Sequence, residues 1–144
     1  EHDPETHLIP NALKAAAGIG GPMKLFGTDY DTRDGTCIRD YVHVMDLADA
    51  HLAALDSVTA GEPEIVANLG TGHGASVLEV LHAVEAVTGR KPSYEVHPRR
   101  DGDAPVLSAD LSHAREILGF DPQRSDIETI IADAWRFHKV KWAI

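Results

Sequence analysis

The chain has 144 residues, the length of one domain, and a formal net charge of −10 at pH 7. Hydrophobic residues make up 43% and charged residues 25% of it, which is typical of a globular protein with a buried core. The negative charge argues against a general nucleic-acid or anionic-membrane surface, but not against a small anionic ligand held by locally gathered basic groups. We expect no signal peptide and no membrane partner, because no apolar run approaches the roughly 18 residues that span a bilayer. One cysteine, Cys37, excludes an internal disulfide and favours the reducing cytoplasm.

The hydrophobic periodicity and the turn residues predict alternating helices and short strands. For the first half we expect a helix from Asp3-Pro4 to Gly18, a strand at Met23–Phe26, a polar loop at Thr28–Thr36, an extended segment at Cys37–Val44, a helix capped by Asp46 and a strand at Ile65–Leu69. For the second half we expect a helix from Ser76 to Thr88, a strand at Ser93–His97, a short helix near His113–Leu118 and a last helix opened by Ser125. This order predicts an α/β or α+β fold with a small mixed sheet and flanking helices, because the strands are too few for a complete doubly wound sheet.

Two S-x-x-E sequences set the expected helix starts. Ser76 with Glu79, and Ser125 with Glu128, have the spacing of a capping box, in which the Ser and Glu side chains satisfy the first free amides of a helix. The position of Ser76 matters for the glycine-rich run Gly70–Ala75, which formally fits the dinucleotide fingerprint G-x-G-x-x-A, with Glu95 as a candidate ribose-binding acid. That fingerprint requires the helix to begin within the glycines. We therefore interpret the run as a tight turn and predict no cofactor-binding residue.

The candidates for catalysis and metal binding are weak. Cys37 would need a base to act as a nucleophile, but His43 lies six residues along an extended segment, about 20 Å away. We therefore interpret Cys37 as a buried structural thiol. The nine histidines lack the spacing of a zinc site. A cation could be gathered at the amino terminus by His2, Asp3, Glu5 and His7. A frayed terminus explains this group more simply. We predict no catalytic residue and no metal site.

Two arginine-bearing blocks stand about sixty residues apart. In the first, GTCIRDYVHV, strand alternation places Arg39, Tyr41 and His43 on one face and Asp40 on the other. An arginine beside an aromatic ring suits a phosphate next to an apolar sugar or base. In the second, PRRDGD, two adjacent guanidinium groups repel each other, and an anionic ligand would relieve this repulsion. The alternative for both blocks is a solvated surface on which the arginines pair with nearby acids.

Three segments, taken together, resemble the UDP-glucose 4-epimerases of the extended short-chain dehydrogenase/reductase superfamily: LFGTDYDTRDGTCIRDYVHVMDLADAHLAAL at Leu25–Leu55, NLGTGHGASVLEV at Asn68–Val80 and PRRDGD at Pro98–Asp103. This resemblance implies an NAD-dependent isomerase that inverts the sugar C4 hydroxyl through a 4-keto intermediate, in galactose metabolism. The family's Tyr-x-x-x-Lys pair and its Gly-x-x-Gly-x-x-Gly turn are both absent. We therefore expect residues 1–144 to be a carboxyl-terminal UDP-sugar-binding region, inactive by itself.

The resemblance also implies partners and site residues. NAD would be held by a missing amino-terminal Rossmann half, on which about residues 45–70 would pack, and the intact enzyme would be a cytoplasmic homodimer. The implied substrate contacts are Lys24, Leu25 and Phe26 at the uracil, Arg39 and Arg100 at the diphosphate, Asp103 at the ribose, Val77 near the nucleotide, and Leu107 where bulk limits N-acetylated sugars. Leu8 belongs to a family Asn-Leu pair at the diphosphate, in which His7 here replaces the Asn, and Tyr41, on the face of Arg39, completes the candidate substrate-binding residues. Two alternatives remain: another nucleotide-sugar enzyme of this superfamily (a dehydratase, decarboxylase or pentose epimerase), and a non-catalytic nucleotide-sugar-binding module.

Overall fold

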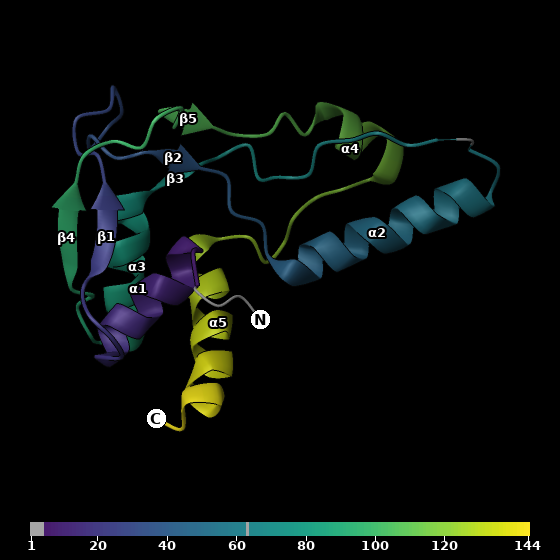
Figure 1. The fold of residues 1–144 in the computed structure, drawn as a ribbon. Coiled ribbons are helices and arrows are strands. Elements are labelled where there is room, and N and C mark those ends of the chain that lie inside the picture. The colour runs from purple at the N-terminus through teal and green to yellow at the C-terminus, as the bar shows by residue number, and fades with distance from the viewer. Residues whose placement is uncertain (1–4, 63) are drawn as a thin grey trace.

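The computed structural model describes residues 5–62 and 64–144 and confirms the predicted α/β class (Figure 1). The elements follow one another in the order α1 (Leu8–Ala17), β1 (Met23–Phe26), β2 (Ile38–Arg39), α2 (Val44–Thr59), β3 (Ala75–Ser76), α3 (Val77–Thr88), β4 (Tyr94–His97), β5 (Val106–Leu107), α4 (Ser112–Leu118) and α5 (Ile127–Trp142). None of the helices within the described residues is long and apolar enough to cross a membrane.

The strands form two small sheets. β1 and β4 pair in parallel, with Met23 opposite Tyr94 and Phe26 opposite His97. β2 lies between β3, which is antiparallel to it, and β5, which is parallel. The crossover from β1 to β4 passes through the β2–β3 region and α3, so one chain path links the two sheets.

The main core lies where α1, α3 and α5 pack together beside β1 (Figure 1). Strand alternation turns Met23 and Leu25 inward, where Leu25 is 1% exposed. Leu13 of α1, Val84 of α3 and Ile131 of α5 are fully buried against it. Full burial of each such side chain stabilises the fold by about 1.5–3 kcal/mol, so these three helices and β1 form one unit.

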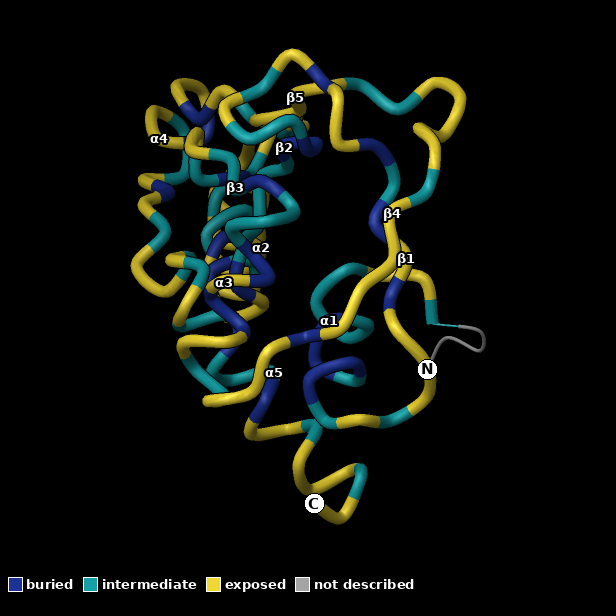
Figure 2. The backbone as a smooth tube through the Cα atoms, turned by 90° about the vertical axis from the view of Figure 1, so that its left-hand side faces the viewer, coloured by how far each residue is buried: buried dark blue, intermediate teal, exposed yellow. Residues whose placement is uncertain are grey.

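A second, smaller cluster lies under α2 and α4, formed by Ala50, Leu111, Ala114 and Phe120. Figure 1 shows α2 as an arm that extends from the rest of the chain with α4 beside it. Burial along the backbone follows this division, with dark segments concentrated around α1 and α3 and yellow ones along the outer loops (Figure 2). Several large apolar side chains of α2 stay exposed, including Leu52, Leu55 and Val58.

The predicted start of the first helix was wrong. α1 begins at Leu8 with His7 as its N-cap, while residues 5–7 are not helical, and Asp3-Pro4 lies outside the described residues. The Glu5 carboxylate accepts a hydrogen bond from the His7 amide at 2.9 Å. This local turn uses an amide just before the helix, so the helix starts one turn later than the Asp-Pro pair indicated.

Two predicted N-caps, Asp46 and Ser125, were wrong because they bind each other. The Ser125 hydroxyl donates to the Asp46 carboxylate at 2.5 Å, and the Arg124 amide donates to the same oxygen at 2.9 Å. His43 caps α2 instead, its Nδ1 accepting from the Met45 amide, and Asp126 caps α5. A tertiary contact between distant segments has replaced the local caps.

The other predicted helix ends are confirmed. Ser76 and Glu79 form the predicted capping box of α3. Gly89 and Gly119 follow α3 and α4 in the left-handed conformation that glycine adopts without steric cost.

The predicted strand at Ile65–Leu69 was also wrong. The segment is not paired with any described strand, because a ladder needs a neighbour with free peptide groups. Burial still alternates along the segment, because Ala67 and Leu69 pack on the second cluster while Val66 is 75% exposed. Likewise, the segment Cys37–Val44 is a strand only at Ile38–Arg39, where it has partners on both sides.

Asp40 fixes the glycine-rich turn that the sequence singled out. Its carboxylate accepts hydrogen bonds from the amides of Thr71 (2.8 Å), Gly72 (3.1 Å) and Ala109 (3.0 Å) and from the Thr71 hydroxyl (2.6 Å). A Cβ on Gly70 would lie 2.5 Å from the Asp40 carboxylate. The glycines therefore serve close packing, and α3 begins only after them, as the interpretation of a tight turn requires.

Asn in place of Asp40 is expected to lower the free energy of unfolding by about 1–3 kcal/mol at pH 7, because it leaves amide donors facing an amide group. Burial alone would raise the pKa of Asp40, but the hydrogen bonds from Thr71, Ala109 and Gly72 outweigh it and hold the pKa below its ordinary value. The stabilisation is therefore present above the unfolded pKa of about 3.9 and is lost as the pH falls through the folded pKa. Urea unfolding at pH 7 and pH 3 measures both effects.

The matched control is Asp56→Asn, an exposed aspartate of α2. It should change stability little at either pH. Equal stabilities of the Asp40→Asn variant and the parent chain at pH 7 would contradict the role of Asp40.

Candidate nucleotide-sugar site

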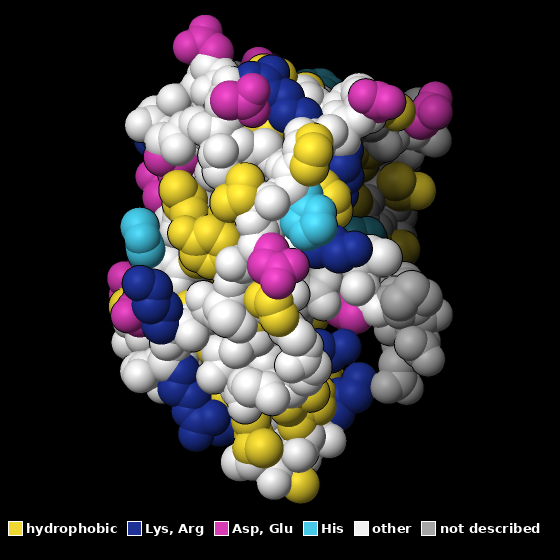
Figure 3. All heavy atoms as spheres, turned by 60° about the vertical axis from the view of Figure 1, so that its left-hand side comes forward, with side chains coloured by type: hydrophobic (Ala, Val, Ile, Leu, Met, Phe, Trp, Pro, Cys, Tyr) yellow, Lys and Arg dark blue, Asp and Glu magenta, His cyan; other side chains and the backbone are white. Residues whose placement is uncertain are grey.

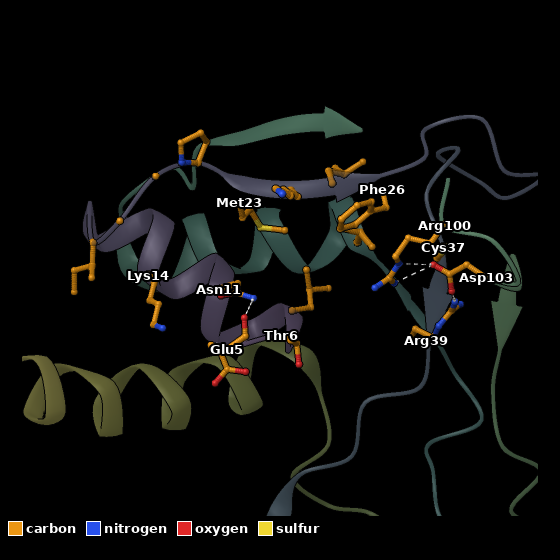
Figure 4. Close-up of a pocket in the computed structure, with 18 of the residues that line it drawn as sticks. Glu5, Thr6, Asn11, Lys14, Met23, Phe26, Cys37, Arg39, Arg100 and Asp103 are labelled. Carbon is orange, nitrogen blue, oxygen red and sulfur yellow. Dashed lines mark hydrogen bonds and ion pairs between the residues drawn. The ribbon is translucent and has the colours of Figure 1, made fainter. Parts of the chain in front are cut away.

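A cavity of about 650 Å³ lies along α1 and β1 and reaches β2 and the loop after β4 (Figure 4). Nine of the ten residues that the resemblance implied line it. They come from five parts of the chain: Leu8, Lys24, Leu25, Phe26, Arg39, Tyr41, Val77, Arg100 and Asp103. The structure therefore brings together residues up to 95 positions apart in sequence, although whether they bind a ligand stays a prediction.

One end of the cavity is a carboxylate shared by two guanidinium groups. Asp103 accepts from Arg39 through one oxygen and from Arg100 through the other, the latter at 3.0 Å (Figure 4). The guanidinium of Arg100 also lies 4.9 Å from the centre of the Phe26 ring. Burial alone would raise the pKa of Asp103, but the hydrogen bonds and charges of both arginines outweigh it and lower the pKa. Two positive charges thus face one negative charge, which leaves this end positive.

The adjacent arginine points elsewhere. Arg99 Nε donates to the Asp29 carboxylate at 2.8 Å, and its guanidinium stacks 4.3 Å from the Tyr30 ring centre. All three arginines thus pair with a nearby acid, as the alternative for both blocks expected, but only Arg39 and Arg100 converge on the same acid, at the cavity. On the face that Figure 3 draws, dark blue Lys and Arg side chains lie close to magenta Asp and Glu side chains near the top of the molecule.

The middle of the cavity is the free edge of β1. The amides of Met23 and Gly27 donate to β4, to Ser93 and His97, at 3.0 and 2.8 Å. Peptide groups alternate along a strand, so those of Lys24 and Phe26 face the opposite edge. No described strand pairs with that edge. The peptide groups of Lys24 and Phe26 thus lack a strand partner among the described residues, and both residues line the cavity.

Tyr41 and Cys37 also line the cavity without forming a catalytic pair. Burial raises the pKa of Tyr41 to about 12, so its phenol keeps its proton at neutral pH. Cys37 is buried, as interpreted from the sequence. His43 was expected on the face of Arg39 and Tyr41, which was wrong: the chain turns into α2, and His43 Nε2 lies 3.3 Å from Asp133 instead.

Leu107 does not line the cavity. It lies on β5 opposite Arg39, with 54% of its surface exposed. No group of three or more metal-binding side chains gathers among the described residues.

The sequence missed the α1 end of the cavity. Glu5, Asn11 and Lys14 line it together with Leu8. The signal was present, because Leu8, Asn11 and Lys14 are spaced at three-residue intervals along one face of a helix. Burial was assigned to the apolar stripe of this helix, and its polar flank was not considered as a site. Figure 4 shows Lys14 at the opposite end from the arginine pair.

Comparison with known proteins places this geometry in context. Residues 1–70 match the NAD dependent epimerase/dehydratase family. The chain is 50% identical to a UDP-glucose 4-epimerase of Rhizobium meliloti. The alignment spans 137 residues, which is 95% of this chain but 42% of that protein. The predicted resemblance to UDP-glucose 4-epimerases is confirmed.

Solved structures agree with the sequence comparison. The UDP-glucose 4-epimerase of Brucella ovis in complex with NAD superposes with a TM-score of 0.88 at 46% identity, over 94% of this chain and 42% of that one. The UDP-glucose 4-epimerase of Stenotrophomonas maltophila, with bound NAD and formylated UDP-arabinopyranose, gives a TM-score of 0.94 at 40% identity. That superposition covers 99% of this chain and 42% of that one. The chain thus spans about two fifths of the length of the relatives it matches.

Asn in place of Asp103 is expected to tighten the binding of inorganic pyrophosphate on the order of fivefold, about 1 kcal/mol. The substitution is nearly isosteric and removes the negative charge that competes with an anion for Arg39 and Arg100. Calorimetric titration of both proteins measures the effect. The control is Asp101→Asn, because Asp101 is a neighbouring acid that does not line the cavity. Weaker pyrophosphate binding by Asp103→Asn would contradict the charge competition.

Proposed function

We propose that this chain is the substrate-binding part of an NAD-dependent UDP-galactose/UDP-glucose 4-epimerase, an isomerase that inverts C4 through a 4-keto sugar. The observation that carries the proposal is the convergence of nine residues, named from the resemblance, on one cavity. Relatives of about 50% identity bear the name UDP-glucose 4-epimerase, which supports this reaction over other nucleotide-sugar enzymes.

The cavity suits the three parts of a UDP-sugar. Arg39 and Arg100 would grip the diphosphate, since guanidinium forks bind such oxygens bidentately. The base would lie on the β1 edge, hydrogen-bonded by the peptide groups of Lys24 and Phe26. Asp103 would accept from ribose hydroxyls with whichever lone pairs the arginines leave free. Leu8, Leu25, Tyr41 and Val77 would supply apolar contacts around the nucleotide.

The sugar would extend out of the cavity past Leu107. This side chain is exposed and stands beside Arg39 in the sheet register, so it lies next to the proposed diphosphate position. Its bulk would then influence whether an N-acetylated sugar fits.

NAD and the catalytic Tyr-x-x-x-Lys would belong to a separate Rossmann half. Residues 45–70 would pack on that half, which accounts for a row of exposed apolar side chains on and after α2: Met45, Leu52, Leu55, Val58 and Val66. Burial of such a patch is the usual reason for its existence. The intact enzyme would be a cytoplasmic homodimer of galactose metabolism, and the one buried, free cysteine suits that compartment.

The second candidate is a nucleotide-sugar-binding module without catalysis. The raised pKa of Tyr41 favours it for the chain by itself, because the tyrosine that lines the cavity within the described residues keeps its proton at neutral pH. Reconstitution with a Rossmann half from a related 4-epimerase separates the two candidates: restored turnover supports the enzyme, and a stable complex without turnover supports the module.

Ala in place of Arg100 should weaken UDP binding by roughly tenfold or more, because a charge-assisted contact contributes on the order of 1.5–3 kcal/mol. Isothermal titration with UDP measures it. Arg136→Ala removes an exposed arginine of α5 that does not line the cavity, and it should leave the affinity unchanged. Equal UDP affinity of the Arg100→Ala variant and the parent chain would sink the assignment of the diphosphate site.

The 144-residue chain with added NAD is expected to show no interconversion of UDP-galactose and UDP-glucose. Neither a hydride acceptor site nor a proton-accepting tyrosine is supplied by the proposed substrate-binding part. A coupled assay with a UDP-glucose-oxidising enzyme measures the product. Turnover by the pure chain would overturn the division of labour between two halves.

A further inference from the structure

The cavity is longer than the contacts assigned so far require. The arginine pair occupies one end and the free edge of β1 the middle, while Glu5, Asn11 and Lys14 line the other end (Figure 4). Leu8 and Lys14 are six residues apart, which is about 9 Å along the axis of α1. A base bound on the β1 edge would therefore have its outer edge directed to Lys14.

Among the described residues that line this end, Lys14 is the one basic side chain. Glu5 is engaged by the His7 ring at 2.7 Å, which with the His7 amide lowers its pKa to about 2. Asn11 donates to the Glu5 carbonyl at 3.2 Å. Within the described residues no ion pair joins Lys14 to an acid, although the chain has 23 acids and 13 basic residues. Lys14 is partly buried as a residue, and a lysine beside a cavity wall without an acid partner gains a hydrogen bond when a ligand provides an acceptor.

The position of Lys14 has one other explanation. It stands in the last turn of α1, where a cation stabilises the helix dipole by about 0.3–1 kcal/mol. That effect needs only a positive charge near the helix end. It does not require the side chain to line the cavity, so the two explanations predict different responses to ligands.

We propose that Lys14 is a specificity-determining residue that donates a hydrogen bond to a carbonyl oxygen on the outer edge of the bound base. This rests on the proposed function, in which a uracil base lies along β1. Uracil presents a carbonyl at position 4, where cytosine presents an amino group. An ammonium facing that amino group would place two donors against each other, so Lys14 favours the 4-oxo pyrimidine.

The test compares Lys14→Met with the parent chain by isothermal titration, using UDP and ribose 5-diphosphate, which lacks the base. Met keeps the apolar length of the side chain and removes its donors. UDP should bind at least tenfold more weakly to the variant, equivalent to about 1.4 kcal/mol, while ribose 5-diphosphate should bind within twofold of the parent. The ratio of UDP affinity to CDP affinity should be smaller for this variant than for the parent chain.

Two control variants separate the base contact from charge and helix stability. Lys139→Met removes a lysine from the equivalent last turn of α5, outside the cavity, and should leave UDP affinity unchanged. Lys14→Arg keeps the charge and the donors and should bind UDP within about threefold of the parent. Circular dichroism confirms that each variant is folded.

The outcomes distinguish this inference from the proposed function. Equal losses of affinity for UDP and for ribose 5-diphosphate would show that Lys14 attracts the anion in general, and would overturn the base contact. Unchanged UDP affinity in Lys14→Met, with loss in Arg100→Ala, would overturn the role of Lys14 and leave the site itself in place. No binding of UDP by the parent chain would overturn both.

Discussion

The arrangement of the site depends on the short segment around Asp40, which hydrogen bonds fix in place. Asp40 binds three peptide amides and a hydroxyl from the turn after Leu69 and the loop after β5. Its neighbours, Arg39 and Tyr41, line the cavity. A carboxylate in a network of this kind has little freedom, so the positions of Arg39 and Tyr41 are set by hydrogen bonds that no ligand provides.

The charge distribution around the cavity follows from this rigidity. Asp103 holds Arg39 and Arg100 close together before any anion arrives. Without that carboxylate, two converging guanidinium groups would repel each other and the flexible Arg100 would turn to solvent. A ligand diphosphate therefore meets preorganised donors and replaces part of an interaction that already exists. Preorganisation of this kind reduces the ordering cost of binding, but the negative charge of the same carboxylate opposes a ligand anion by more than this gain.

Local patterns in the sequence predicted much of this fold. The capping box of Ser76 and Glu79, the strand Met23–Phe26 and the glycine that ends α3 depend on neighbouring residues, and they were predicted correctly. The caps at Asp46 and Ser125 were predicted wrongly because each side chain found a better partner 79 residues away. Spacing alone cannot reveal such a partner. The strand at Ile65–Leu69 failed for a related reason, since a strand exists only with a neighbour.

Site residues show the same division. Arg39 and Arg100 stood in patterns that the residues alone left open, because surface arginines paired with nearby acids look the same in sequence, and it was the resemblance that identified their relation. Lys14 carried no signal, because a lysine near a helix end is ordinary in sequence and acquires meaning only when the helix is placed along a cavity.

The wrongly predicted caps also explain how the α2 arm keeps its direction. His43 and Asp46, both almost fully buried, join the start of α2 to the segment before α5 through Ser125 and to Asp133 of α5 itself. Arg39 lies only four residues before this joint. These contacts tie the start of α2 to α5, which packs on α1 beside the cavity. The residues that failed as local caps are thus the ones that connect the arm to the helices beside the cavity.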